Sequence, residues 1–180
     1  MVYAIIRVRG LVNINGGVQD TMRMLRLTRV NTLAIVPKDP SHDGMVKKIK
    51  DFVTYGELDH ATLVSLMKAR GRVAGYKPIT DEFVKNATGG KHATIDAFAK
   101  AVVDGKAKFQ DLGEDAKLYF RLHPPIGGYE AIKRHFTVGG SLGYRGKEIN
   151  TLIKRMMPET VSADNVARGR GVGKRVEKEA

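Results

Sequence analysis

The sequence predicts an α+β fold, and three observations support this prediction. Residues 2–57 alternate between strand-like and helix-like patterns, in the order strand, helix, strand, helix, strand. Residues 58–117 have the spacing of several short helices separated by glycines. Strand character returns at residues 118–122 and is followed by two glycine-rich turns. A five-element unit as short as the first one predicts a single sheet with both helices on one of its faces.

The elements of the first unit follow from side-chain spacing and from breaker residues. Val and Ile dominate the strand-like runs, which are interrupted by glycines, asparagines and prolines. Met22 and Leu25 lie three residues apart, as do Ile49 and Phe52, and both pairs indicate an apolar helix face. We therefore expect strands over residues 2–8, 32–36 and 53–57, and helices over residues 18–29 and from an N-cap at Ser41 to about residue 53.

The middle of the chain contains three residues that are typical of helix starts. Asp59, Thr80 and Thr94 each precede a segment with helical spacing, and Gly105 ends the last of these segments. A further helix is expected near residues 147–157, after the glycine-rich turns. The predicted organisation is therefore a core at 1–57, a helical insertion at 58–117, a returning strand with glycine-rich loops and a helix at 118–157, and a basic tail at 158–180.

Basic residues are concentrated at the two ends of the chain. The net charge is +12, with 31 Lys and Arg against 19 Asp and Glu. Residues 1–50 contribute +6 and residues 121–155 contribute +5, whereas residues 51–120 hold ten basic and ten acidic residues. Excess charge often serves only solubility, but solubility does not require this uneven distribution. We expect the two basic ends to share one surface that binds a polyanion, because cations beside phosphates release condensed counterions.

Several classes of function find no support in the sequence. The chain has no cysteine, which excludes disulfides and thiolate metal sites, and its five histidines form no HxxxH pair. The segment 140–147 resembles a phosphate-binding P-loop, but Ser141 replaces the first required glycine and Glu148 replaces the Ser or Thr that would hold magnesium. We expect no catalytic site, metal, cofactor or small-molecule substrate. Without a signal peptide or a long apolar run, we expect a soluble cytoplasmic protein with no membrane partner.

The segment 119–157 combines glycine-rich turns with cations and aromatic residues. Glycines allow the backbone to approach phosphates, and aromatic rings can stack on unpaired bases. Tyr129, Phe136 and Tyr144 are the candidate stacking residues, although Phe136 and Tyr144 could equally belong to the core. The cations of this segment favour contact with folded RNA, and they are Arg121, Lys133, Arg134, Arg145 and Lys147.

Five sequence blocks carry a resemblance to one family. They are Arg7-Val8-Arg9-Gly10, Thr21-x-x-Met24-Leu25-Arg26-Leu27, Asn31 through Pro37, Phe120-Arg121-Leu122-His123-Pro124-Pro125, and Gly139-Gly140-x-Leu142-Gly143-Tyr144-Arg145-Gly146-x-Glu148-Ile149-Asn150-x-Leu152-Ile153. In this order they resemble the archaeal and eukaryotic form of the large-subunit ribosomal protein L-thirty, called L-seven in eukaryotes. The resemblance covers residues 2–157.

The resemblance implies a ferredoxin-like core with a three-stranded antiparallel sheet, a helical insertion and no catalysis or cofactor. It implies that the protein is a ribosome-bound structural constituent of the large subunit. Its partners would be large-subunit rRNA near the 5S RNA and neighbouring ribosomal proteins. The RNA-facing positions that it carries over are Arg7, Arg9, Arg23, Arg26, Arg29, Arg145 and Lys147.

Residues 158–180 depart from the family pattern, and their low apolar content predicts a tail that is disordered until it meets RNA. Two other functions share part of this pattern. An rRNA-processing, modifying or assembly factor would act on the same RNA, and an enzyme of that kind needs a pocket with tuned acid–base groups, which these residues do not assemble. A chromatin-like DNA binder would share the charge but not the sequence blocks.

Overall fold

A computed structural model describes residues 2–12, 14–113 and 115–157, so the predictions for the tail 158–180 lie outside the described residues. The first unit contains β1 (Val2–Arg7), α1 (Gly16–Met24), β2 (Thr32–Pro37), α2 (Pro40–Ile49) and β3 (Val53–Glu57). The rest contains α3 (His60–Arg70), α4 (Asp81–Ala87), α5 (Ile95–Val103), β4 (Tyr119–Arg121), β5 (Gly143–Tyr144) and α6 (Ile149–Met156). Short 3-10 turns lie at Ala74–Tyr76, Phe109–Leu112, Phe136–Val138 and Gly146–Glu148.

The α+β fold is confirmed, but the sheet has five strands in the described residues and not three. Its order is β4-β2-β1-β3-β5. The three-stranded antiparallel sheet that the resemblance implies is present, with β1 paired to β2 and β3. β4 adds antiparallel to β2, and the two-residue β5 adds parallel to β3. A strand of two residues, one of them glycine, has too little pattern to be predicted from sequence.

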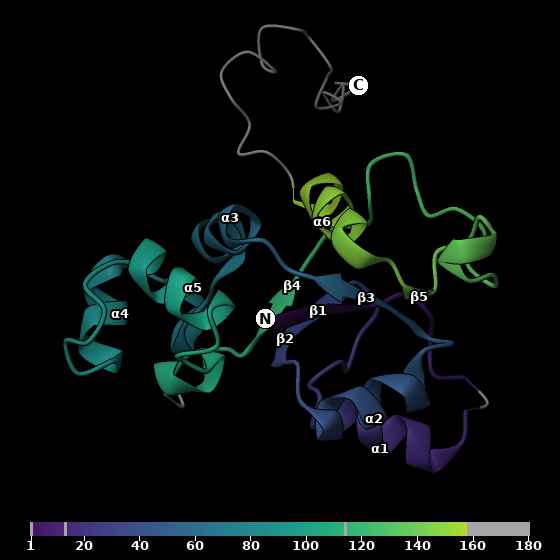
Figure 1. The fold of residues 1–180 in the computed structure, drawn as a ribbon, viewed down its shortest axis with the longest axis horizontal. Helices are drawn as coiled ribbons and strands as arrows, with labels where there is room; N and C mark the ends of the chain where they lie inside the picture. Colours follow the sequence, from purple (N-terminus) through teal and green to yellow (C-terminus); the bar gives the residue numbers. More distant parts are fainter. Residues whose placement is uncertain (1, 13, 114, 158–180) are drawn as a thin grey trace, which may run out of the picture.

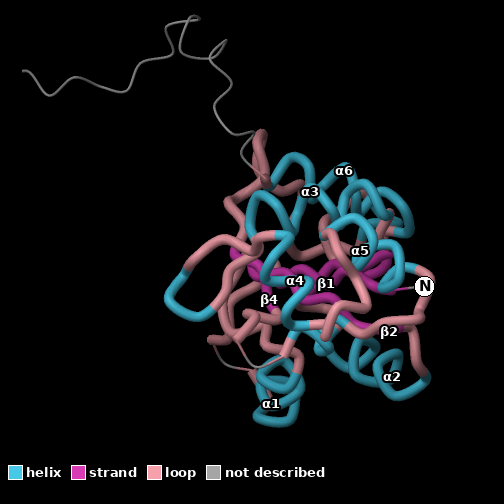
Figure 2. The backbone as a smooth tube through the Cα atoms, turned by 90° about the vertical axis from the view of Figure 1, so that its left-hand side faces the viewer, coloured by secondary structure: helices cyan, strands magenta, loops and turns pink. Residues whose placement is uncertain are grey.

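Helices cover both faces of the sheet. Figure 1 shows α1 and α2 on one side and α3 and α6 on the other, and Figure 2 shows the same layers after a 90° turn. Tyr3 and Ile5 of β1 belong to the core cluster with α1 and α2, which confirms the predicted single face for these helices. Ala4 and Ile6 belong to the second cluster, with α3, α5 and α6. Burial on both faces explains why β1 is apolar from Val2 to Ile6.

The helical middle shares its core with the sheet. The Phe98 ring of α5 lies 6.2 Å from Phe109, whose ring lies 5.4 Å from Phe120 of β4, measured between centroids. Thr80 and Thr94 cap α4 and α5 as predicted, because their side chains accept hydrogen bonds from backbone N–H groups. The division of the chain at residues 57 and 117 stays a prediction.

The bounds of the first two helices differ from the expected ones. The first helix ends at Met24 and not near residue 29, because Arg26 adopts a left-handed φ of 60°. The amides of Arg26 and Leu27 then donate to the carbonyls of Arg23 and Met22, which is the Schellman arrangement usually made with glycine. The second helix begins at Pro40 after Asp39, so Ser41 is not its N-cap.

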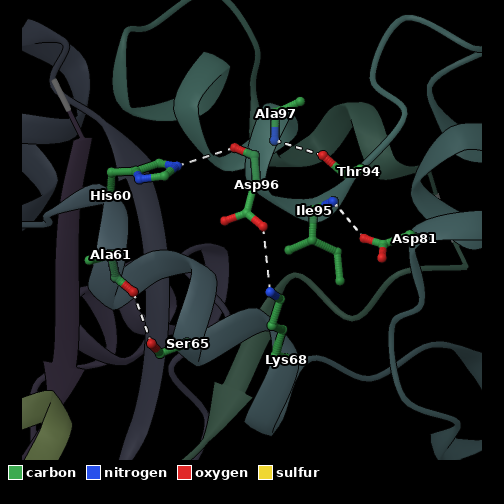
Figure 3. Close-up of polar contacts among 9 residues, drawn as sticks. All are labelled: His60, Ala61, Ser65, Lys68, Asp81, Thr94, Ile95, Asp96 and Ala97. Carbon is green, nitrogen blue, oxygen red and sulfur yellow. Dashed lines mark hydrogen bonds and ion pairs between the residues drawn. The ribbon is translucent and has the colours of Figure 1, made fainter.

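Polar contacts join α3 to α5 and fix the acidic residues of the middle (Figure 3). The Asp96 carboxylate lies 3.4 Å from the Lys68 ammonium, and the Asp96 carbonyl lies 3.2 Å from a ring nitrogen of His60. The Asp81 carboxylate accepts from the Ile95 amide at 2.8 Å. These carboxylates therefore stabilise the helical layer.

Candidate nucleic-acid interface

The strand register brings both basic ends of the chain to one end of the sheet. Ile6, near the end of β1, pairs with Leu33, near the start of β2. Thr32 pairs with Arg121, the last residue of β4. Arg7 pairs with Val53, the first residue of β3, and the adjacent Thr54 pairs with Gly143 of β5. We call this end of the sheet the basic end. It includes the α1–β2 loop, the segment after β1 and the glycine-rich loops before β5.

Asp51 contacts residues from both basic segments of the chain, 1–50 and 121–155. Its backbone carbonyl accepts a hydrogen bond from the Arg9 guanidinium at 3.0 Å. Its carboxylate lies 3.2 Å from Nε2 of His135, in the glycine-rich region. The Arg9 guanidinium also lies 5.0 Å from the centroid of the Phe52 ring. Arg9, from residues 1–50, and the loop that carries His135, from residues 121–155, are therefore neighbours in the fold.

Arg7 occupies an interior position, which contradicts the RNA-facing position predicted for it. Its side chain is 3% exposed. The guanidinium donates to the carbonyls of Arg9, Leu27 and Thr28 at 2.9, 2.9 and 2.6 Å. Burial lowers the pKa of the Arg7 guanidinium. Arg7 therefore ties β1 to the α1–β2 loop, and it is left out of the candidate interface.

Most of the remaining predicted cations are exposed. Arg23, Arg26 and Arg29 follow one another along the end of α1 and the loop to β2, and all three are exposed. Arg23 forms an ion pair with Asp20 at 3.6 Å, which is weak because both side chains lie in solvent. The other exposed positions of the predicted set are Arg121, Lys133, Arg134 and Lys147.

The glycine-rich loop that carries Lys133 and Arg134 is tightly folded. The Leu142 amide donates to the Arg134 carbonyl at 3.1 Å, and the Phe136 amide donates to the Leu142 carbonyl at 2.8 Å. A Cβ at Gly140 would collide with the Arg134 backbone, so only glycine fits there. The loop therefore presents its two cations from a defined backbone.

Arg145 is half-buried between this loop and β3. Its guanidinium carbon lies 4.3 Å from the centroid of the Phe136 ring, and its Nε donates to the Thr54 hydroxyl at 3.4 Å. Burial lowers the pKa of Arg145, and the nearby Glu130 acts in the opposite direction. Arg145 therefore combines a packing role with partial exposure, so a change at this position alters the loop as well as its charge.

The three aromatic candidates have different environments. The Tyr129 hydroxyl donates to the Asn31 side chain at 2.7 Å, and burial raises the pKa of this hydroxyl well above its usual range. Tyr129 therefore braces the loop. Phe136 lies against Arg145, as described above. Tyr144 is 48% exposed, and its ring centroid lies 5.6 Å from that of Tyr55. Tyr144 is the candidate with a ring open to an unpaired base.

Sequence reasoning missed a second set of cations. Arg70, Arg72 and Lys117 come from the neutral middle, and they line a recess together with Arg121. The only signal in the sequence was the close spacing of two arginines around Gly71. Within the described residues, no group of His, Asp and Glu side chains could hold a metal ion, and no helix is long and apolar enough to span a membrane.

Comparisons with known proteins agree with the sequence blocks. A model of the family described as ribosomal protein L30p/L7e matches residues 3–53. The large ribosomal subunit protein uL30 of Methanoculleus marisnigri is 49% identical over 154 residues, which are 86% of this chain and 99% of the relative. The proteins of the same description from Methanocorpusculum labreanum and Archaeoglobus fulgidus are each 46% identical, with the same coverage. The chain therefore belongs to the ribosomal protein L30p/L7e family, in its archaeal form.

Proposed function

We propose that this chain is a structural constituent of the large ribosomal subunit, bound to the ribosome in the cytoplasm. In this role it binds and stabilises large-subunit rRNA through the basic end of its sheet. One observation supports the proposal above the others: the strand register gathers Arg29, Arg121 and the loop cations at one end of the sheet. The curated relatives are described as large ribosomal subunit proteins.

The proposed contacts divide into cations that position RNA and an aromatic ring that can stack. Arg9, Arg23, Arg26 and Arg29 would meet the phosphates on the α1 side, and Lys133, Arg134, Arg145 and Lys147 would meet them on the loop side. Phosphate contacts of this kind fix the orientation of a protein on RNA without reading its sequence. Tyr144 would stack on an unpaired base beside the loop cations.

The resemblance in sequence supports a finer proposal for the partners. The interface would lie next to the 5S RNA, and neighbouring ribosomal proteins would contact the surfaces that RNA leaves free. Reconstitution of the large subunit with and without 5S RNA tests this placement. We expect incorporation of the chain to fall when 5S RNA is omitted, and unchanged incorporation would remove the 5S contact from the proposal.

A binding experiment with matched variants tests the interface. The variant Lys133→Gln/Arg134→Gln/Lys147→Gln removes three exposed loop cations, and the control Lys85→Gln/Lys91→Gln/Lys100→Gln removes three exposed lysines from the α4–α5 region. Figure 1 places α4 and α5 far from β5. Filter binding to large-subunit rRNA is measured as a function of salt concentration. Each lost phosphate contact lowers the slope of log affinity against log salt by about 0.7–0.9.

We therefore expect the slope to fall by about 2–3 for the loop variant and to stay unchanged for the control. Equal losses in both variants would mean that the net charge alone, and not the basic end, determines affinity. Equal affinity of the unaltered chain for duplex DNA and for structured rRNA would refute RNA-specific binding. Turnover of an rRNA fragment by the purified chain would favour a processing enzyme instead.

A further inference from the structure

A recess beside β4 is lined by four cations and two aromatic rings. The basic side chains come from the end of α3 and the residues just after it, from the segment that leads into β4, and from the last residue of β4. The lining residues are Arg70, Arg72, Tyr76, Lys117, Tyr119 and Arg121. These six residues supply no carboxylate. Their position is notable because three of the cations belong to residues 51–120, which carry no net charge as a whole.

The backbone fixes the positions of these cations. A Cβ at Gly71 would collide with the Met67 carbonyl, so the chain can turn closely after α3 only with glycine there. The Lys117 amide then donates to the Arg72 carbonyl at 3.0 Å, and Val73 forms a bridge with Ala116. Arg72 and Lys117 are therefore held side by side by main-chain hydrogen bonds and not only by flexible side chains.

Tyr76 is held at the rim by an unusual turn. Gly75 and Tyr76 both have left-handed φ angles, of 75° and 62°. This conformation costs a residue with a Cβ about 1–2 kcal/mol. The Tyr76 side chain is nevertheless 61% exposed, with the Lys117 ammonium 3.2 Å from its ring centroid. A strained turn that displays an aromatic ring beside a cation favours a role in binding over a role in packing.

The charges around the recess explain why an anion would be stabilised there. Asp81 and Asp96 contact α5 and α3 (Figure 3), so these acids of the middle do not line the recess. None of the ion pairs among residues 2–12, 14–113 and 115–157 uses a cation that lines it. Burial, and then the nearby Arg72, lower the pKa of Arg70. Arg70 and Arg72 therefore repel each other, and a bound anion would relieve that repulsion.

We propose that this recess binds a backbone phosphate of RNA, with an unpaired base next to that phosphate stacked on Tyr76. The inference rests on the proposed function and extends it, because it gives the helical middle, which carries no net charge as a whole, a contact with RNA. Arg121 links the recess to the basic end, since it lines the recess and pairs with Thr32 at the start of β2.

A pair of matched double variants tests the phosphate contact. Arg72→Gln/Lys117→Gln removes two cations of the recess, and Lys85→Gln/Lys100→Gln removes two exposed lysines from α4 and α5. Affinity of the full chain for large-subunit rRNA is measured at several salt concentrations, and thermal unfolding checks the fold. We expect about a tenfold loss of affinity and a slope lowered by about 1 for the recess variant only. If the recess variant is folded and its affinity and salt slope match those of the control, the proposal is overturned.

Two substitutions at the rim test the stacked base. Tyr76→Phe keeps the ring, so we expect affinity within about twofold of the unaltered chain. Tyr76→Ala removes the ring, and the loss of one stacking contact should weaken binding by about fivefold or more. Equal affinities for the two variants would contradict base stacking at this position.

Cross-linking keeps the proposal testable even if the double variant unfolds. Because the chain has no cysteine, one introduced thiol can carry a photo-cross-linker without background. Lys77→Cys places it beside Tyr76, and Lys91→Cys places it on the exposed turn between α4 and α5. In the reconstituted subunit we expect an RNA adduct from position 77 and none from position 91. An adduct from position 77 with protein alone would show that the recess meets a protein, and would overturn the proposal.

The outcomes separate this inference from the proposed function. If the unaltered chain does not bind large-subunit rRNA, the proposed function fails. If it binds, and the Lys133→Gln/Arg134→Gln/Lys147→Gln variant is weakened while the recess variant is not, only the recess proposal fails.

Discussion

The interior position of Arg7 leads to a prediction that separates a structural arginine from an RNA-binding one. Arg7→Met keeps an apolar side chain of similar length and removes the guanidinium. Three backbone carbonyls, those of Arg9, Leu27 and Thr28, then lose their hydrogen-bond donor. The matched change Arg29→Met removes a guanidinium from an exposed position in the neighbouring loop.

The expected loss of stability follows from how deeply each bond is buried. The bond to Leu27 is fully buried, and a hydrogen bond from a charged donor contributes about 1.5–3 kcal/mol. The bonds to Arg9 and Thr28 are partly buried, and each contributes about 0.5–1 kcal/mol. Burial of the guanidinium, which lowers its pKa, offsets part of this sum. We therefore expect Arg7→Met to lower the free energy of unfolding by about 3 kcal/mol.

Urea denaturation followed by circular dichroism measures this loss. For a chain of this size, 3 kcal/mol corresponds to a fall in Tm of roughly 6–12 °C. Arg29→Met should change the free energy of unfolding by less than about 0.5 kcal/mol, while weakening rRNA binding. If Arg7→Met is as stable as Arg29→Met, the guanidinium does not hold the loop. Arg7 would then return to the set of candidate RNA contacts.

Three further predictions test the core, the loop and the recess. Leu25→Ala opens a cavity at a side chain that is 6% exposed. Urea denaturation should show that the free energy of unfolding falls by about 2–5 kcal/mol. A loss under about 1 kcal/mol would contradict the burial of Leu25 in the core. Gly140→Ala forces the loop away from the Arg134 backbone, so limited proteolysis should cleave residues 131–142 faster, and an unchanged cleavage rate would contradict the tight fold. The pKa of the Tyr76 hydroxyl is lowered first by Lys117 and then by Arg121 and Arg29. Lys117→Gln should therefore raise it towards the ordinary value in an ultraviolet pH titration, with Tyr76→Phe identifying the signal.

The elements with a strong local pattern were predicted from the sequence, and those set by distant contacts were not. The third strand begins and ends where its pattern does, and Thr80 and Thr94 cap their helices, because these features depend on a few adjacent residues. The end of α1 was missed because Arg26 adopts the backbone conformation that usually requires glycine. β5 was missed because its two residues form a strand only beside β3.

The candidate site shows a similar division. The uneven charge predicted that the two ends of the chain would meet, and the contacts of Asp51 with Arg9 and His135 bring them together. Burial of Arg7 could not be foreseen, because it depends on the α1–β2 loop, whose Leu27 and Thr28 carbonyls accept the hydrogen bonds of its guanidinium. The recess was not predicted, because the net charge of residues 51–120 combines its cations with acids, such as Asp96, that lie elsewhere in the fold.

The closing of the sheet by β5 and α6 has a consequence for the order in which the protein matures. The chain is made from its N-terminus, so β1, β2 and β3 leave the synthesising ribosome before their last partners exist. α6 packs against β3 and α3, and Tyr129 reaches back to Asn31. Until these late residues emerge, part of the apolar face that α6 covers stays open to aggregation, although α3 and α5 already lie on that face. The basic end of the sheet, which is proposed to bind RNA, is therefore completed only when the late residues of the chain have been synthesised.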